Sequence, residues 1–552
     1  MVDLSPYVGR WVAMVRDRVV GVGQSEDQAR HMATQNRPKE KHRLLYVSPQ
    51  VQVARAAAQH PLLQTAYDLA ARHDIPVYLV GGSVRDLLLG LEIHDLDFAV
   101  QGNGLDLARR VADRLRGAFV ALDQKRQTGR VILLPGSAIH AEARVRHLDF
   151  ASLRGSDLLA DLRDRDFTFN AMALERTPEG QFRLRDPLDG STDLARRILR
   201  AASPTSFVSD PVRTLRAVRM MARFRCQAEP QTFTWLQEAV PDLLSVSAER
   251  IRDEWFNILQ QAQASSALRQ LHELGLLTLV APPLAALQGL AQPVRAPQRH
   301  RATALTHAFE TVRAVEELWA AFAENGGSLI KVPGALSKLG PHIRQRYSAL
   351  VCDERSHLAL LKCAALLHDV GKPETRSVDP DGRVRFLGHE RAGARIAHEL
   401  ARRWRCSNAE ANILRTAVEA HMRPTLLARE PSLSRRAVYR FYRDTGDAGL
   451  DAAFVALADY VATWGPDRPG EGWRRQAETV ARLWSAHFDQ HRTVVSPRPL
   501  LSGKELLKLG VPPGPGLGAI LERLREEQAA GEVRTRQGAL AMVKDWLAKE
   551  RD

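Results

Sequence analysis

The chain has 552 residues, which excludes a single ordinary hydrophobic core and predicts several domains. Lys and Arg number 78 against 64 Asp and Glu, and the resulting formal charge of +14 favours a polyanionic partner over an acidic surface or a small cation. The four cysteines are too far apart for a disulfide framework or a cysteine metal site; they are Cys226, Cys352, Cys363 and Cys406.

The first 50 residues form a small unit by their pattern. Residues 9–15 and 17–23 are typical of strands, residues 25–35 of a capped helix, and residues 43–47 of a closing strand. We therefore expect a small α/β unit here, and the sequence assigns it no role.

The segment "YLVGGSVRDLLLGLEIHDLDFAV", residues 78–100, combines a glycine pair, an arginine and two nearby aspartates. Side chains two apart on a strand point to one side, so Asp95 and Asp97 present both carboxylates to the same face. Paired oxygen ligands suit Mg²⁺, which completes its shell with water and substrate phosphates. The amides of Gly81 and Gly82 can form an anion-binding turn, and the segment therefore predicts phosphoryl chemistry on a nucleotide.

Two further features support this prediction. In "RHLDFASLRG", Asp149 repeats the pattern of an aspartate between Leu148 and Phe150, and a neighbouring strand can supply it as a third carboxylate. Arg85 lies close enough in sequence to the glycine pair to contribute a fixed positive charge to a triphosphate. An isolated Asp-x-Asp pair is often a solvated loop, and it is the glycines, the arginine and the strand that favour a site.

Together, "GGSVRDLLLG" and "HDLDF" resemble the catalytic signature of the class II tRNA nucleotidyltransferase and bacterial poly(A) polymerase family, within the polymerase-β superfamily. The resemblance implies that Asp95 and Asp97 bind Mg²⁺, that Asp149 assists activation of the terminal hydroxyl, and that Gly81, Gly82 and Arg85 hold the triphosphate.

Two later motifs extend the resemblance. "DLRDRDFTFNAMA", residues 161–173, is similar to the ribose-contacting motif, which implies sugar contacts by Arg165 and Asp166 with Asn170 alongside. The family has Arg-Arg-Asp here, whereas this chain has Asp164 before Arg165.

"SDPVRTLRAVRMMARFR", residues 209–225, predicts a helix from near Pro211 with an arginine stripe that includes Arg216 and Arg219. The stripe by itself is also typical of a solvated face. The resemblance implies that Asp210 and Arg213 read the edge of the incoming base, and a carboxylate can accept from the exocyclic amino group that C and A share. The family's Glu is replaced by Ser209.

A second set of residues follows in the helical half. The pair in "LLHDVG" and three later residues resemble the metal ligands of the HD phosphohydrolase superfamily, with His307 preceding them. The expected ligands are His368, Asp369, His389, His421 and Asp459. Imidazoles favour a transition metal such as Ni²⁺, Co²⁺ or Mn²⁺ over Mg²⁺. The alternative is a scaffold that has lost its activity.

The expected fold class is a multidomain α+β protein with a polymerase-β-like nucleotidyltransferase head followed by all-helical neck, HD-type and C-terminal domains. The expected ranges are 1–50 for the N-terminal unit, 51–200 for the head, 201–285 for the neck with the base-reading helix, 300–465 for the HD-type domain and 474–552 for an RNA-binding tail.

The resemblance implies a template-independent enzyme that adds or repairs the 3′ CCA end of tRNA from CTP and ATP. The alternatives are an enzyme that adds only CC or only A, a poly(A) polymerase, or a metal phosphohydrolase with an RNA-binding first half. The basic, Phe-containing signature of poly(A) polymerases is not found between residue 97 and residue 161. With no apolar stretch long enough for a bilayer and no secretion signal, we expect a cytoplasmic protein without a membrane partner.

Overall fold

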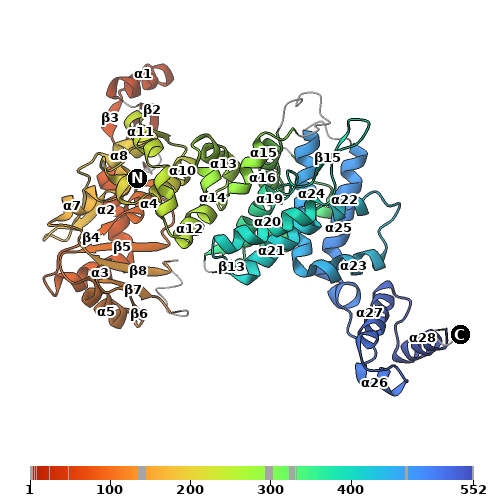
Figure 1. Cartoon of the computed structure of the whole chain (residues 1–552). Coiled ribbons are helices and arrows are strands. Elements are labelled where there is room, and N and C mark those ends of the chain that lie inside the picture. Colours follow the sequence, from red (N-terminus) through yellow and green to blue (C-terminus); the bar gives the residue numbers. More distant parts are fainter. Residues whose placement is uncertain are drawn as a thin grey trace. The chain divides into compact units, whose positions relative to one another are not determined.

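The computed structural model divides into two compact units, Met1–Leu243 and Leu244–Asp552 (Figure 1). It describes the whole chain except residues 1–3, 5–6, 8, 24, 48, 135–144, 292–302, 323–329, 331, 353, 466–469 and 550–552. The expected boundary between 285 and 300 includes residues 292–300, and the one between 465 and 474 includes residues 466–469, which the structure does not describe. Among the described helices, none combines the length and apolar composition that a bilayer span requires.

The first unit opens with the small domain expected from the sequence. Strands β1 (Trp11–Val15), β2 (Arg18–Gly23) and β3 (Arg43–Tyr46) form an antiparallel sheet in the order β2-β1-β3, with α1 (Glu26–Asn36) packed against β2. The helix approaches closely because Gly21 lacks a side chain: a Cβ there would lie 2.3 Å from the Ala29 carbonyl oxygen. The predicted strands and helix are confirmed.

A seven-stranded sheet follows, in the order β10-β9-β4-β5-β8-β7-β6. Its strands are β4 (Val77–Val80), β5 (Asp95–Val100), β6 (Ala118–Asp123), β7 (Thr128–Ile132), β8 (His147–Ser152), β9 (Ala173–Arg176) and β10 (Phe182–Arg185). Only β5 and β8 pair in parallel. Phe98 and Phe150 stack across this pair with ring centroids 4.7 Å apart, under α5 (Gly104–Leu115). The sheet therefore holds β5 and β8 side by side at its centre.

Helices complete the first unit around this sheet. They are α2 (Pro49–Gln59), α3 (Pro61–Ala71), α4 (Gly82–Leu89), α7 (Leu158–Arg163), the 3₁₀ turn η2 (Thr168–Asn170), α8 (Gly190–Arg196), α9 (Ser206–Ser209), α10 (Arg213–Phe224) and α11 (Pro230–Glu238). Two short strands, β11 (Ile198–Leu199) and β12 (Gln227–Ala228), pair in parallel with each other. The predicted base-reading helix is α10, which begins at Arg213.

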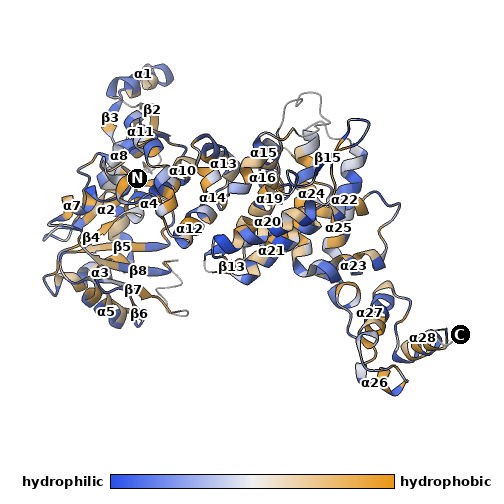
Figure 2. Cartoon of the chain, in the orientation of Figure 1, coloured by the Kyte–Doolittle hydropathy of each residue, from blue (hydrophilic) through white to orange (hydrophobic). Residues whose placement is uncertain are grey.

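The described part of the second unit is helical apart from two short hairpins, β13 (Leu350–Cys352) with β14 (Arg355–Ser356) and β15 (Arg376–Val378) with β16 (Val384–Phe386), as the pattern predicts (Figure 1). Its main helices are α12 (Ala248–Leu259), α13 (Ala264–Glu273), α16 (Ala304–Ala321), α18 (Gly340–Ser348), α19 (His357–Leu367), α20 (His389–Arg403), α21 (Asn408–Ala420), α22 (Arg423–Leu427), α23 (Arg435–Thr445), α24 (Gly449–Trp464) and α25 (Gly470–Asp489). Apolar α24 packs against α16, α19, α21 and α25 and is buried along most of its length. Hydrophobic and hydrophilic residues alternate along the helices of both units (Figure 2), the pattern of helices that bury one face.

The C-terminal segment has a hydrophobic cluster of its own. Helices α26 (Gly503–Lys508), α27 (Pro515–Ala530) and α28 (Arg536–Lys549) contribute Leu506, Leu524, Val543 and Trp546 to it. The cluster begins at Leu501, whereas residue 474, the expected start of the tail, lies inside α25. Helix α25 packs against α24 through two buried tryptophans, Trp473 and Trp484.

Candidate active site and metal-binding cluster

The parallel pair β5–β8 brings the three predicted carboxylates together. Asp97 is directly opposite Asp149, and Asp95 is opposite His147. Leu96 is fully buried on the other side of β5, in agreement with the predicted alternation. The grouping of two aspartates from one strand with a third from its neighbour is confirmed.

The electrostatics of this group disfavour its full ionisation. Burial, the charge of Asp149 and that of Asp95 raise the pKa of Asp97 to about 6, against the opposing effect of Arg165. Arg130 on β7 donates to both oxygens of Asp149, from Nε at 2.8 Å and Nη2 at 2.7 Å. The three carboxylates supply the hard oxygen ligands of a divalent cation, whose charge would relieve their repulsion, so the donor set fits such an ion.

Two residues that the sequence analysis missed belong to this group. Arg130 holds Asp149, and the Nδ1 atom of His147 lies 3.2 Å from an Asp95 oxygen. His147 stands two residues before Asp149 on β8 and therefore shares its face, which is a signal that the sequence offered. Arg130 is opposite Asp149 only through the antiparallel register of β7 and β8.

The glycine turn lies against the carboxylates. Gly81 has a φ of +75°, and a Cβ at this position would lie 3.0 Å from the Arg165 guanidinium and 3.8 Å from Asp97 Oδ2. Gly82 begins α4, whose Ser83 hydroxyl donates to the Asp95 carbonyl at 2.9 Å and accepts from the Asp97 amide. This missed serine therefore fixes the turn to the start of β5.

Arg85 is buried beneath this turn with 4% of its surface exposed. Its guanidinium donates to the Asn170 side-chain oxygen at 2.5 Å, pairs with Asp86 at 2.7 Å and stacks over Phe224 at 4.6 Å. Burial lowers its pKa. In this arrangement Arg85 orders Asn170 and α4; its predicted contact with triphosphate stays a prediction.

The ribose-contact residues form a connected network. Asp166 is buried and accepts from the Asn170 side chain at 3.0 Å and from Arg216 at 3.3 Å. Burial alone would raise its pKa, but Arg216 and the hydrogen bonds outweigh burial and hold the pKa below its ordinary value. Arg165 is bound by Asp161 at 2.9 Å. The structure thus brings Arg165, Asp166, Asn170 and Arg216 into one neighbourhood.

The predicted base-reading pair lies at the start of α10. Arg213 is 7% exposed and donates to the carbonyls of Asp164, Arg165 and Ser206, at 2.7, 3.2 and 3.1 Å. Its Nε lies 3.9 Å from Asp210 and has no hydrogen-bond partner in the described chain. Arg219 is half-buried two turns from the start of this helix. Arg213 therefore ties the helix to the ribose-contact segment and leaves one donor beside Asp210.

The second unit contains the other predicted cluster. His368 Nε2 lies 3.2 Å from one Asp369 oxygen, and His389 Nε2 lies 3.4 Å from the other. The rings of His368 and His389 are each centred 5.3 Å from that of His421. The predicted grouping of these four residues is confirmed.

Backbone carbonyls orient the three imidazoles. The Nδ1 atoms of His368, His389 and His421 donate to carbonyls three residues earlier, at 2.7 to 2.8 Å. Their buried Nε2 atoms have no hydrogen-bond partner in the described chain. A metal-bound imidazole commonly has its other nitrogen fixed in this way. Burial and the charge of His368 lower the pKa of His421 to about 3, which keeps it neutral and able to bind a metal.

His307 on α16 completes the cluster, although the predicted ligand set omitted it. Its Nε2 lies 2.9 Å from Asp459, the fifth predicted ligand, and 3.9 Å from Asp369. Burial alone would raise the pKa of Asp459, but the hydrogen bond and charge of His307 lower it below its ordinary value. His307 was named ahead of the set from the sequence, and its place among the apolar residues Ala304, Leu305 and Ala308 was the signal available there. The donors form two overlapping groups around Asp369, one with His307 and His368 and one with His389 and His421, and both fit a metal ion.

Family models match three parts of the chain: a poly A polymerase head domain over residues 77–200, a probable RNA and SrmB-binding site of polymerase A over 227–287 and an HD domain over 334–464. Solved structures of similar fold include the Thermotoga maritima CCA-adding enzyme complexed with tRNA (TM-score 0.53, 20% identity, 89% of this chain and 98% of that one). Another is a CCA-adding enzyme with ATP (TM-score 0.58, 21% identity, 90% and 99%).

Curated relatives match over nearly their whole length. The A-adding tRNA nucleotidyltransferase of Deinococcus radiodurans is 34% identical over 85% of this chain and 95% of its own. The CC-adding tRNA nucleotidyltransferase of Thermus thermophilus is 33% identical over 86% and 96%. The carboxylates on β5 and β8, the glycine turn beside them and this extended similarity lead to one conclusion: the chain belongs to the tRNA nucleotidyltransferase family.

Proposed function

We propose that the protein completes the 3′ CCA end of tRNA by adding nucleotides from CTP and ATP. The observation that carries the proposal is the register of β5 and β8, which sets Asp97 opposite Asp149 with Asp95 on the same face and the Gly81–Gly82 turn against them. Nucleotidyl transfer needs such a carboxylate group for divalent metal beside a backbone turn for phosphate.

Asp95, Asp97 and Asp149 would hold Mg²⁺, which all-oxygen ligands favour. When bound, Mg²⁺ supplies positive charge that favours ionisation of the attacking 3′ hydroxyl and stabilises the leaving pyrophosphate. Arg130 fixes the orientation of Asp149, which faces the terminal hydroxyl of the RNA in this proposal. Ser83 fixes the start of β5 and with it the position of the other two carboxylates.

The remaining residues would bind the nucleotide. The amides of Gly81 and Gly82 face the triphosphate, and Arg85 supports them directly or through Asn170. Arg165 and Asp166 contact the ribose, with Asn170 and Arg216 holding the Asp166 carboxylate in place. Asp210 and Arg213 read the base edge, and Arg219 adds positive charge on the same helix. The Nε of Arg213, which lies 3.9 Å from Asp210 and makes no hydrogen bond in the described chain, supports this assignment.

A second candidate is a partial enzyme, favoured by the relatives named A-adding and CC-adding. Three tRNA substrates separate the candidates: one that ends before CCA, one that ends after C and one that ends after CC. Each is incubated with each triphosphate alone and with CTP plus ATP, and the products are sequenced. We expect C on the first two, A on the third and a complete CCA end from the mixture.

The outcomes exclude one another. Addition of A to the third substrate alone identifies an A-adding enzyme, and addition that stops after CC identifies a CC-adding enzyme. A long homopolymer from ATP identifies a poly(A) polymerase. No addition to any substrate contradicts nucleotidyl transfer altogether and favours the phosphohydrolase with an RNA-binding first half.

We further propose that the cluster of His307, His368, Asp369, His389, His421 and Asp459 holds a transition metal and hydrolyses phosphate esters or cyclic nucleotides. Its imidazole-rich donor set favours Ni²⁺, Co²⁺ or Mn²⁺ over Mg²⁺. The alternative is an inactive scaffold, and a wild-type protein without hydrolysis in the presence of any of these ions would support it. We also propose that the protein is cytoplasmic, in keeping with its similarity to tRNA nucleotidyltransferases.

A further inference from the structure

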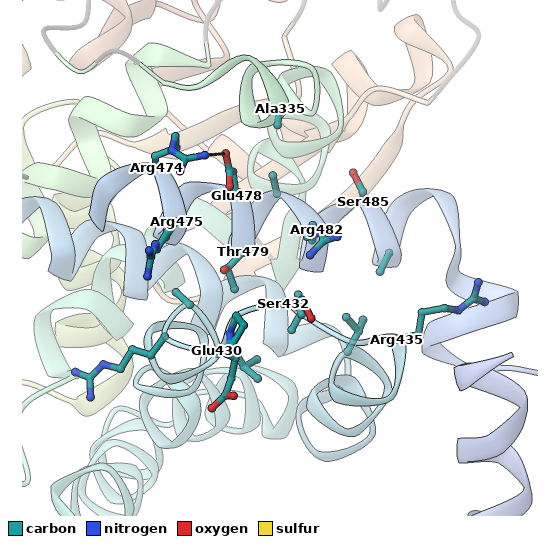
Figure 3. Close-up of a pocket in the computed structure, with 18 of the residues that line it drawn as sticks. Ala335, Glu430, Ser432, Arg435, Arg474, Arg475, Glu478, Thr479, Arg482 and Ser485 are labelled. Atoms are coloured by element: carbon teal, nitrogen blue, oxygen red, sulfur yellow. Dashed lines mark hydrogen bonds and ion pairs between the residues drawn. The ribbon is translucent and has the colours of Figure 1, made fainter. Parts of the chain in front are cut away.

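A large cavity in the second unit is separate from the metal-binding cluster. It has a volume of about 1110 Å³. It is lined by α25, by residues 427–433 from the end of α22 onward and by the start of α23 (Figure 3). Five arginines line it: Arg429, Arg435, Arg474, Arg475 and Arg482. Three glutamates accompany them: Glu430, Glu471 and Glu478. The lining therefore carries a positive balance.

The local ion pairs leave part of this positive charge uncompensated. Arg474 pairs with Glu478 at 3.1 Å (Figure 3). Glu471 pairs with Arg474 at 2.8 Å and with Arg475 at 2.7 Å. Arg435 donates to the Ala529 carbonyl, which carries no formal charge. The side chains of Arg429 and Arg482 have no hydrogen-bond or ion-pair partner among the described residues. Three guanidinium groups thus retain positive charge that no carboxylate neutralises.

The sequence of α25 places four of its lining residues on one face. Arg475, Thr479, Arg482 and Ala486 recur at intervals of three or four residues, so they line the cavity together. Arg435 comes from α23, and Figure 3 shows it and Arg482 on different helices of the lining. Arginine is suited to this position because its planar fork binds two phosphate oxygens at once.

We infer that this cavity binds the phosphate backbone of the tRNA. The inference rests on the proposed function, which makes an RNA the substrate. Phosphate is favoured over bases because no aromatic side chain is among the described lining residues, whereas base recognition by single-stranded RNA sites uses aromatic stacking. An acidic protein is the competing occupant, and it would not require tRNA affinity to depend on these arginines.

The test measures tRNA affinity of the full-length protein by fluorescence anisotropy across salt concentrations, for Arg429→Ala, Arg482→Ala and the double variant. Each single change should weaken binding roughly threefold to tenfold and reduce the slope of log affinity against log salt by about one. Arg482→Lys should recover part of the loss because it restores charge without the fork. These side chains are exposed, so the thermal midpoint should not change.

Two variants sharpen the test. Glu430→Gln removes the lining carboxylate that has no described partner and should strengthen tRNA binding, since it repelled phosphate. Arg395→Ala is the matched control: it changes the net charge equally, but Arg395 lies on α20 outside the lining and is paired with Glu374 and Glu399. Its effect on tRNA affinity should be under twofold.

Nucleotide addition measured over a range of tRNA and triphosphate concentrations separates this inference from the proposed function. The arginine variants should raise the KM for tRNA and leave both kcat and the KM for the triphosphate unchanged. Unchanged tRNA affinity in the double variant, with normal addition by wild type, overturns the cavity assignment alone. Arginine-dependent tRNA binding without any addition by wild type supports the cavity and overturns the proposed function.

Discussion

At the scale of single residues, the three carboxylates of the head have opposite consequences for activity and for stability. Replacing Asp95 or Asp97 with alanine should abolish nucleotide addition, because each removes an oxygen ligand that no neighbour replaces. Affinity for tRNA should remain, since phosphate contacts from Lys and Arg dominate it. Product sequencing and a binding titration test this, with the exposed Asp113→Ala as control. Near-normal addition by either variant would contradict the assignment.

Asp97 allows a second residue-scale prediction. Its pKa is raised to about 6 by burial and by Asp149, so its ionised form destabilises the folded head at pH 8. Asp97→Asn should therefore raise the midpoint of thermal unfolding in metal-free buffer, by the equivalent of roughly 1 to 3 kcal/mol. Addition of Mg²⁺ should stabilise the wild type more than the variant. A lower midpoint for the variant without metal would show that the carboxylate is not strained by its neighbours.

The two base-reading residues should behave differently from each other. Asp210→Ala should reduce discrimination among the four triphosphates more than triphosphate affinity, because the phosphates are held elsewhere. Arg213→Ala should also destabilise the head, since it leaves the carbonyls of Asp164, Arg165 and Ser206 without a donor. Competition between triphosphates in one reaction measures the first effect, and an unchanged preference would place base reading outside α10.

At the scale of elements, α21 depends on one buried ion pair at its start. Glu410 is fully buried, accepts from the Ser407 amide and hydroxyl as a capping box, and pairs with Arg355 at 2.6 Å. Burial alone would raise the pKa of Glu410, but Arg355 and Ser407 lower it below its ordinary value. The carboxylate is therefore held ionised inside the protein by groups from two separate segments.

Arg355→Ala should lower the free energy of unfolding by about 3 to 5 kcal/mol, because it leaves a buried charge without its partner. The double variant Arg355→Met, Glu410→Met should recover most of this loss. Arg415→Ala is the control, because Arg415 lies on α21 with Glu410. Its exposed pair with Glu419 should contribute no more than about 0.5 kcal/mol to the free energy of unfolding. Urea unfolding monitored by helical circular dichroism measures all three. Equal losses for Arg355 and Arg415 would contradict the role of burial.

At the scale of the whole molecule, the two proposed activities belong to different compact units. The carboxylates of β5 and β8 lie in the first unit and the histidine cluster in the second. Since the two donor sets differ in chemistry, we expect addition to require Mg²⁺ and hydrolysis to require a softer ion.

His368→Ala should remove hydrolysis and spare nucleotide addition, while Asp95→Ala should do the reverse. Both reactions are assayed on one preparation of each variant, with Mg²⁺, Mn²⁺, Co²⁺ and Ni²⁺ in turn. Circular dichroism and the unfolding midpoint confirm that the His368 variant is folded. Loss of both reactions in a folded His368 variant would refute the independence of the two sites.

The local parts of both sites could be predicted from the order of the residues. The two-residue spacing of Asp95 and Asp97 within a strand fixes their common face, and the glycine pair marks a turn, because both depend only on backbone geometry within a few residues. The arginine helix and the adjacent His368–Asp369 pair were readable for the same reason. These patterns also carried the family resemblance that the relatives confirm.

The contacts between residues far apart in the chain could not be predicted and come from the folded protein. Arg130 reaches Asp149 through the register of β7 on β8, and His307 reaches Asp459 across 152 positions of the chain. The fold also showed that Arg85 and Arg213 are buried and bonded within the head, whereas their sequence motifs alone favoured contacts with substrate. The physical reason is that strand register and helix packing depend on the hydrophobic surfaces of remote segments, which local spacing does not encode.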